Sequence, residues 1–207
     1  MNQLLGNLAA TVIGCVVVMI TLAMQIRAQE LTADATVSYA AKGQSLGTAE
    51  WMHDDLVNVG WGVPAGDPTM EAPVYDAAGR TRRFAFFRKA TKDSAAVAPD
   101  SMRFVYELRF QDSVRVADAW TRHYQVVRCQ TPTTATGDCP AAARGGSSRR
   151  VSDFRIDLLG QDGAAASTDA ARLVRLRFTS TVPLAENRPS TYLRSTFYAT
   201  TLPLPER

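Results

Sequence analysis

The sequence predicts an α+β protein in which a long N-terminal helix packs on a C-terminal antiparallel sheet, and two patterns lead to this fold class. No charged side chain occurs before Arg27, which is typical of a helix that crosses a membrane. In the second half of the chain, apolar and polar residues alternate with a period of two, which is typical of strands that bury one face. We therefore expect residues 1–26 in the membrane, residues 27–60 as an amphipathic continuation of the helix, and residues 61–207 as a sheet-based head domain.

The predicted membrane span lies in residues 4–26, LLGNLAATVIGCVVVMITLAMQI, which hold only small, apolar or uncharged polar side chains. About 20 residues that rise about 1.5 Å each match a hydrocarbon core about 30 Å thick. A cleavable secretory signal is the alternative, but such a signal normally begins with basic residues, and the opening MNQ has none. A retained single-pass membrane anchor is therefore the favoured interpretation.

The helix is expected to continue past the membrane because no proline occurs between Arg27 and Pro64. Apolar residues recur there at intervals of three and four, which forms one stripe on a helix with 3.6 residues per turn. The members of this stripe are Leu46, Ala49, Met52, Leu56 and Val59. We expect the stripe to pack on the sheet and Gly60 to end the helix, since glycine is common at a left-handed C-terminal cap.

The stretch WMHDDLVNVGWG, residues 51–62, places His53 beside Asp54 and Asp55. Consecutive residues of a helix are about 100° apart around its axis, so these three side chains fan out and cannot converge on one ion. Asp54 and Asp55 are therefore expected on the solvent side of the helix end.

The head is predicted to be an antiparallel sheet with one solvated face. In MRFVYELRF, Phe104, Tyr106 and Leu108 share one face, whereas Arg103 and Glu107 share the other. One-sided burial of this kind is typical of antiparallel sheets, and the helix stripe is the expected cover of the apolar face. The predicted strands are residues 102–110, 120–129, 151–159, 172–182 and 191–202, and the predicted loops are residues 60–81, 129–150 and 160–171.

Two cysteines of the head, Cys129 and Cys139, bracket the turn-rich segment QTPTTATGD. A zinc site would need further Cys or His at short spacing, and the whole chain has only 2 His. A disulfide that closes a surface loop is therefore the better interpretation. Disulfides persist in oxidising compartments, so the C-terminal domain is expected outside the cytoplasm.

Few residues point to chemistry. His53 and His123 are the only imidazoles, and the chain has no glycine-rich phosphate loop or HExxH motif. The net charge of +3 comes from scattered arginines, which does not indicate a nucleic-acid partner. We therefore expect no catalysis, no cofactor and no resident metal. Calcium at Asp157, Asp162 and Asp169 is an alternative, although their spacing does not match an EF-hand loop.

Three features of the chain are considered together: the N-terminal helix, the neck EWMHDDLVNVGWGVP at residues 50–64, and the late pattern VSDFRIDLLGQDG followed by ARLVRLRFTSTVPL. Together they resemble the type IV pilin-like family, with the minor pilins and the pseudopilins of type II secretion as the closest likeness. The start departs from the family pattern. Where such precursors end their leader in glycine this chain has Gly6, followed by Asn7, and Thr11 stands where the family has glutamate.

The resemblance implies a non-enzymatic filament subunit that waits in the membrane lipid and then assembles with other pilin-like subunits, at or near the cell surface. Small residues on the helix would permit close approach of neighbouring helices, and Val17 lies on the same segment. The expected assembly positions are Gly6, Ala9, Ala10, Gly14 and Val17. The alternative is a monomeric, single-pass, membrane-anchored extracytoplasmic binding domain.

Overall fold

The computed structural model describes residues 2–89, 101–116, 119–140, 147–183 and 193–205. Its elements are one helix, α1 (Asn2–Val57), and seven strands, β1 (Val74–Tyr75), β2 (Thr81–Lys89), β3 (Ser101–Val116), β4 (Ala119–Pro132), β5 (Ser147–Leu159), β6 (Leu173–Pro183) and β7 (Leu193–Pro203). The chain divides into two compact units, Met1–Ala40 and Ala41–Arg207. The predicted α+β class is confirmed for these described residues.

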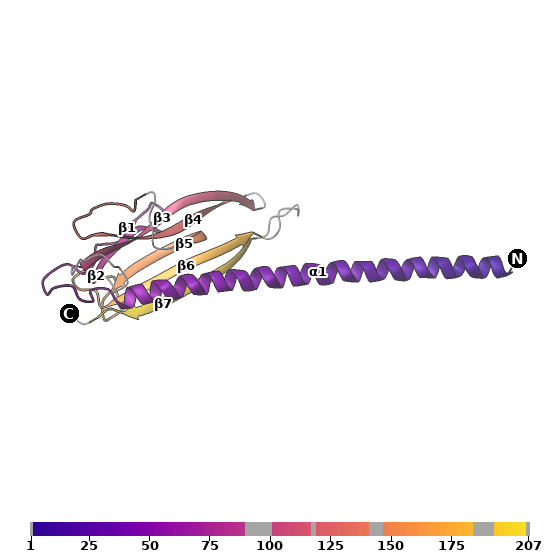
Figure 1. The fold of residues 1–207 in the computed structure, drawn as a ribbon, viewed down its shortest axis with the longest axis horizontal. Coiled ribbons are helices and arrows are strands. Elements are labelled where there is room, and N and C mark those ends of the chain that lie inside the picture. Colours follow the sequence, from indigo (N-terminus) through magenta and orange to yellow (C-terminus); the bar gives the residue numbers. More distant parts are fainter. Residues whose placement is uncertain (1, 90–100, 117–118, 141–146, 184–192, 206–207) are drawn as a thin grey trace. The chain divides into compact units, whose positions relative to one another are not determined.

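The first unit is the N-terminal part of α1 (Figure 1). Every side chain in residues 10–26 is exposed, and Val17 is 56% exposed. The hydroxyls of Thr11 and Thr21 each donate to a carbonyl oxygen four residues earlier, at 2.8 Å, so the helix satisfies its own polar side chains. Within the described residues, α1 is the one helix long and apolar enough to cross a membrane.

The seven strands form one sheet in the order β1 to β7, with every neighbouring pair antiparallel (Figure 1). The five alternating stretches of the sequence fall in β3 to β7, as predicted, except that Arg172 precedes β6 and residues 191–192 lie outside the described residues. β1 lies in the range 60–81 that was expected to be a loop. β2 lacks alternation because Phe84, Ala85 and Phe86 are all buried, and a strand covered on both faces carries consecutive apolar residues.

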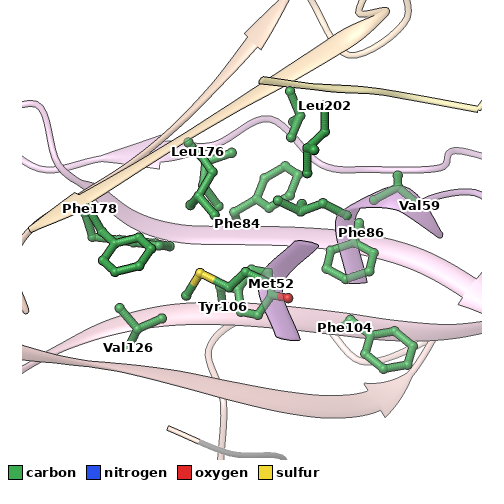
Figure 2. Packing of buried hydrophobic residues seen from close by; sticks show 14 of the residues in the cluster. Met52, Val59, Phe84, Phe86, Phe104, Tyr106, Val126, Leu176, Phe178 and Leu202 are labelled. Carbon is green, nitrogen blue, oxygen red and sulfur yellow. The ribbon is translucent and has the colours of Figure 1, made fainter. Parts of the chain in front are cut away.

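The core of the second unit forms where the last turns of α1 face the sheet. Met52 and Leu56 are fully buried and Val59 is 2% exposed. They belong to one cluster with aromatic side chains of β2 and β3, among them Phe86 and Tyr106 (Figure 2). This part of the predicted helix stripe is therefore correct.

Leu46 is a correction to that stripe, because its side chain is 57% exposed. Ala49 of the predicted stripe is buried, and the other buried positions of this part of α1 are Ala41, Ser45 and Thr48, followed by Met52. They keep the spacing of three and four, but their side chains are small or polar. Hydrophobicity alone therefore pointed to the neighbouring leucine, which lies on the flank of the helix.

The helix ends at Val57, and the chain then turns onto β2. Gly60 has a φ of +79°, as expected for the left-handed cap, and its N–H donates to the carbonyl oxygen of Phe87 at 2.8 Å. The N–H of Lys89 donates to the carbonyl oxygen of Trp61, also at 2.8 Å. These backbone bonds hold the segment after the helix against β2 and set where the stripe meets the core.

The pairing of β4 with β5 covers only a few residues, from Tyr124 to Val127. Farther along β5, side chains replace the missing strand neighbour at Ile156. The N–H of Ile156 donates to Thr81 Oγ1 at 2.8 Å, and its carbonyl oxygen accepts from the Tyr75 hydroxyl at 2.9 Å. These bonds satisfy buried backbone groups and place β1 beside β5.

Candidate functional site

Asp55 on α1 is the centre of a buried polar cluster that sequence reasoning missed. Its side chain is 5% exposed, and its carboxylate accepts a hydrogen bond from the Tyr106 hydroxyl at 2.6 Å. Arg88 Nη2 lies 3.0 Å from Oδ1, and Arg128 binds both carboxylate oxygens, with Nη2 at 2.9 Å from Oδ1. The expectation that Asp55 faces solvent is therefore wrong.

Aromatic side chains contact the charged groups of this cluster. The guanidinium groups of Arg88 and Arg128 lie 4.4 and 4.9 Å from the centre of the Phe104 ring, within the range of cation–π attraction. Burial and the negative charge of Asp55 raise the pKa of Tyr106 well above its usual value, so this phenol remains a neutral donor. The cluster joins α1 to β2, β3 and β4, and both carboxylate oxygens of Asp55 are bound within it, which indicates a structural role. Among the described residues, Arg88 Nε is buried without a hydrogen-bond partner.

The helical spacing of the buried residues in α1 indicated that Asp55 could also be buried. Asp55 follows Met52 by three residues and precedes Val59 by four, which places it within the buried stripe. Asp55 was nevertheless expected to face solvent, because charged residues usually do. His53 and Asp54, by contrast, are exposed as expected, and the three side chains do not form a joint site.

The disulfide between Cys129 and Cys139 is confirmed. It closes a loop over the second face of β2 and β3, where Ala85 and Val105 join the two cysteines in a small separate core. This face was predicted to be solvated, and the prediction is wrong for Arg103, which is 1% exposed. The disulfide holds the loop there, so residues on both faces of β3 become buried.

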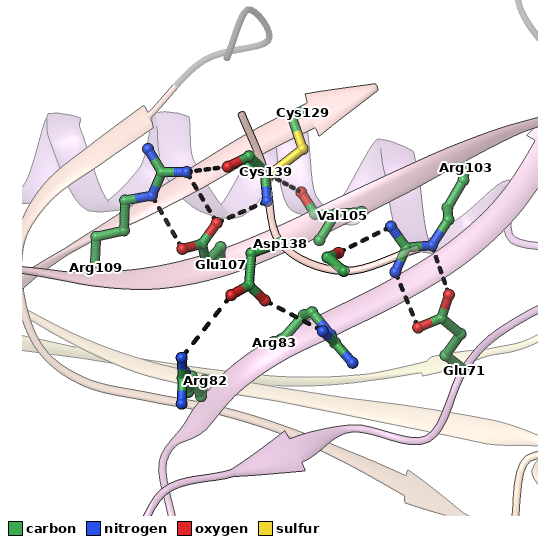
Figure 3. Close-up of polar contacts among 11 residues, drawn as sticks. Glu71, Arg82, Arg83, Arg103, Val105, Glu107, Arg109, Cys129, Asp138 and Cys139 are labelled. Carbon is green, nitrogen blue, oxygen red and sulfur yellow. Dashed lines mark hydrogen bonds and ion pairs between the residues drawn. A yellow bond between two sulfur atoms is a disulfide. The ribbon is translucent and has the colours of Figure 1, made fainter. Parts of the chain in front are cut away.

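Ion pairs anchor the same loop (Figure 3). Arg103 binds both carboxylate oxygens of Glu71, and its Nη1 donates to the carbonyl oxygen of Gly137 at 3.1 Å. Glu107 accepts from the N–H of Cys139 at 2.9 Å and also binds Arg109. Every one of these charges has an opposite charge beside it, so the loop is a tethered cover without a visible reactive group.

A second cluster of charges lies on β5 and β6, around Asp157. This carboxylate is bound by Arg155 at 2.8 Å, Arg175 at 3.0 Å and Arg177 at 2.9 Å. Burial raises the pKa of Asp157, but the hydrogen bonds from Arg155 and Arg175 and the arginine charges outweigh burial and lower it below its usual value. Asp157 was considered as a calcium ligand, and its oxygens are instead committed to arginines.

Few groups in the described residues suit a metal or a catalytic step. Within this part of the chain, no three His, Cys, Asp or Glu side chains are placed to hold a metal ion. Asp162 Oδ1 accepts from the N–H of Ala164 at 3.0 Å and closes its own turn. A cavity of about 310 Å³ lies between the 59–70 segment, Ala171 and Leu204, and Asp67 is the one titratable residue among its described lining.

The expected assembly positions all lie in α1. Ala10, Gly14 and Val17 are exposed, and a Cβ atom built on Gly14 would meet nothing within 4 Å. The side chains of Gly6 and Ala9 lie outside the described ones. The structure therefore shows no packing partner for Gly14 among the described residues.

Comparison with known proteins identifies no family for this chain. No protein-family model matches it, and neither a curated protein nor a solved structure gives a significant match. The class that the fold defines is an α+β protein with an apolar N-terminal helix that can cross a membrane, joined to a disulfide-bonded antiparallel head.

Proposed function

We propose that this protein is a non-enzymatic structural subunit, a minor pilin or pseudopilin, of a type IV pilus or a type II secretion-like filament. The observation that carries the proposal is the state of α1. Residues 10–26 expose apolar side chains along their whole length, whereas the last turns of the same helix are buried in the core of the head. The C-terminal part of the helix is thus part of the head core, whereas its N-terminal part offers an apolar surface that lipid or another helix can cover.

The exposed segment has two suitable environments. Lipid can cover it in the monomer, and helices of neighbouring subunits can cover it in a filament. Gly14 favours the second, because glycine in a helix interior costs about 1 kcal/mol relative to alanine, and among the described residues no atom lies within 4 Å of the place where its Cβ would be. Small residues allow close helix–helix approach in membranes, so a neighbouring helix would account for Gly14.

The proposed location follows from the apolar N-terminal segment and from the disulfide of the head. The apolar segment would sit in the inner membrane before assembly. The Cys129–Cys139 disulfide favours an oxidising compartment for the head, which gives a single-pass protein with an extracytoplasmic C-terminal domain. After assembly the head would be displayed on the filament, with other pilin-like subunits as partners.

Two substitutions in the apolar segment test this function. Gly14→Leu fills the space for a neighbouring helix, and Val17→Asp places a charge on the packing surface. Both are expected to remove the protein from sheared filaments, since they disturb helix contacts. Because residues 10–26 take no part in the head core, the Cys129–Cys139 disulfide should still form.

Val17→Leu is the matched control, because it keeps an apolar side chain of similar size and should enter filaments normally. The measurement is the amount of protein in the sheared fraction against the membrane fraction. Normal incorporation of Gly14→Leu and Val17→Asp would contradict helix-driven assembly. Wild-type protein confined to the membrane of filament-forming cells would favour a monomeric membrane-anchored binding domain.

A further inference from the structure

The outer face of the sheet, away from the helix, carries an excess of positive charge at β5 and β6. Arg155, Arg175 and Arg177 surround Asp157 there, and Asp153 is the second carboxylate on the same face. The three arginine side chains are 44%, 40% and 31% exposed. We call Arg155, Arg175 and Arg177 the arginine patch.

Asp157 uses only a minority of the donors in the arginine patch. A guanidinium group has five N–H donors, but Arg155 gives one of them to Asp157, Arg175 two and Arg177 one. A carboxylate has about four acceptor positions, so these bonds saturate Asp157. Of the remaining donors, Arg177 Nε is buried, and those on the exposed parts of the three side chains are available to acceptors from outside the head.

The strand register gives a second reason to expect a negatively charged partner from outside the head. Arg155 lies directly opposite Arg177 in the antiparallel pair of β5 and β6, and like charges in such positions are destabilising. On the neighbouring strand, Phe197 is paired with Thr179 and 64% exposed on the same face. Arginine donors that Asp157 does not use thus lie on the same face as an exposed aromatic ring.

The opposite side of the head presents the complementary pattern. Exposed residues of α1 recur at intervals of three and four there, which places them on one stripe of the helix. This exposed stripe consists of Leu46, Glu50, His53, Asp54 and Val57. Leu46 and Val57 are 57% and 41% exposed, and the carboxylates of Glu50 and Asp54 lie between them.

The distance between Glu50 and Asp54 on the helix is similar to the distance between Arg155 and Arg177 on the sheet. Glu50 and Asp54 are four residues apart on a helix, so their Cβ atoms are about 5–6 Å apart. Arg155 and Arg177 are direct cross-strand partners, whose Cβ atoms are about 4.5–5.5 Å apart. Two carboxylates at this separation can face two guanidinium groups at once.

We infer that the exposed stripe of one copy binds the arginine patch of a second copy, with Glu50 and Asp54 facing Arg155 and Arg177, and Leu46 or Val57 near Phe197. The inference rests on the proposed filament function and names a head contact within it. The two surfaces lie on opposite sides of the same head, so a copy cannot satisfy its own patch. Such a head-to-tail contact leaves one surface free at each end and can propagate.

Charge reversal tests the contact in full-length protein expressed in filament-forming cells. Glu50→Cys and Arg155→Cys are introduced on separate copies, and oxidative crosslinking reports the contact. Both copies carry Cys15→Ser, which removes the free, exposed cysteine of the described residues. Because like charges across an interface are strongly unfavourable, Asp54→Arg on the first copy is expected to lower the crosslinked dimer about tenfold. Arg177→Glu on the second copy should lower it similarly, and the two changes together should restore it.

Control variants separate this contact from other effects. Arg122→Glu reverses an exposed arginine outside the patch and should leave crosslinking unchanged. Because Arg177 also holds Asp157, Arg177→Glu carries a risk to folding, but Asp54→Arg probes the same contact from an exposed position of α1. Equal crosslinking in Asp54→Arg and wild type would overturn the inference.

The outcomes also separate this inference from the proposed function. If charge reversal changes nothing while wild-type protein is found in sheared filaments, the head contact is wrong and the filament function stands. If wild-type protein is absent from filaments, the proposed function fails. Crosslinked dimer that follows the charge swap in the membrane fraction would then still support the contact between copies.

Discussion

The hydroxyl of Tyr106 on β3 donates a 2.6 Å hydrogen bond to the carboxylate of Asp55 on α1, and this bond ties the helix to the sheet inside the core. Trp51 packs beside the same tyrosine, with ring centres 5.5 Å apart. Because Arg88 and Arg128 share the carboxylate, the helix is fixed in register by direction-dependent polar contacts as well as by apolar packing. This relationship leads to the first prediction.

Asp55→Ala is expected to destabilise the head by about 3–5 kcal/mol, because removing one partner leaves buried charges uncompensated. The remaining charges are Arg88 and Arg128, whose side chains are 12% and 14% exposed. Urea unfolding of the full-length protein in detergent measures the free energy of unfolding. Asp54→Ala is the matched control and should stay within about 0.5 kcal/mol of wild type. Equal effects of the two variants would contradict the buried cluster.

Met52→Ala and Leu46→Ala distinguish the observed helix face from the one that hydrophobicity predicted. Met52 is fully buried and Leu46 is 57% exposed. We expect a loss of about 2–5 kcal/mol for Met52→Ala and a change within about 0.5 kcal/mol for Leu46→Ala. The same urea titration compares the two, and a large loss for Leu46→Ala would show that Leu46 is part of the core.

Gly60→Ala and Gly47→Ala are expected to have opposite effects. Gly60 has a positive φ, and an added Cβ would lie 2.9 Å from Thr69 Cγ2, so this substitution should cost at least about 1 kcal/mol. Gly47 lies inside α1 with open space around it, and alanine there should stabilise by about 0.5–1 kcal/mol. Thermal unfolding of both variants checks the difference. A midpoint for Gly60→Ala at or above that of wild type would count against the cap.

The arginines around Asp157 predict a pH dependence of stability. The pKa of Asp157 is lowered in the folded state, because the hydrogen bonds and charges of the arginines outweigh the effect of burial. The unfolded chain then binds more protons than the folded one, so stability rises with pH. The contribution is complete above the unfolded pKa of about 3.9 and is lost as the pH falls through the lower folded pKa.

Asp157→Asn removes this titration, so its free energy of unfolding should fall less steeply than that of wild type between about pH 5 and pH 2. Asp162→Asn is a control in the neighbouring turn, where the carboxylate contacts a backbone N–H. Equal slopes for Asp157→Asn and wild type would show that the arginines do not control this carboxylate.

Local patterns were sufficient for much of the fold. The uncharged N-terminal segment, the alternation in β3 to β7 and the Cys129–Cys139 pairing were predicted from residues that are close in the sequence. β2 was missed because consecutive buried residues, Phe84 to Phe86, do not alternate. The closing disulfide loop also changed one face of β3 from solvated to covered.

The sequence by itself determined the long helix and the strands β3 to β7, because helix and strand periods depend on neighbouring residues. Only the tertiary structure decided which polar side chains are buried, because that depends on partners far along the chain. Asp55 is the clearest case: helical spacing places it on the buried stripe, and Arg88 and Arg128 from β2 and β4 bind its carboxylate there. In the same way Leu46 is left on the exposed stripe, because the small residues Ala41, Ser45 and Thr48 face the head instead.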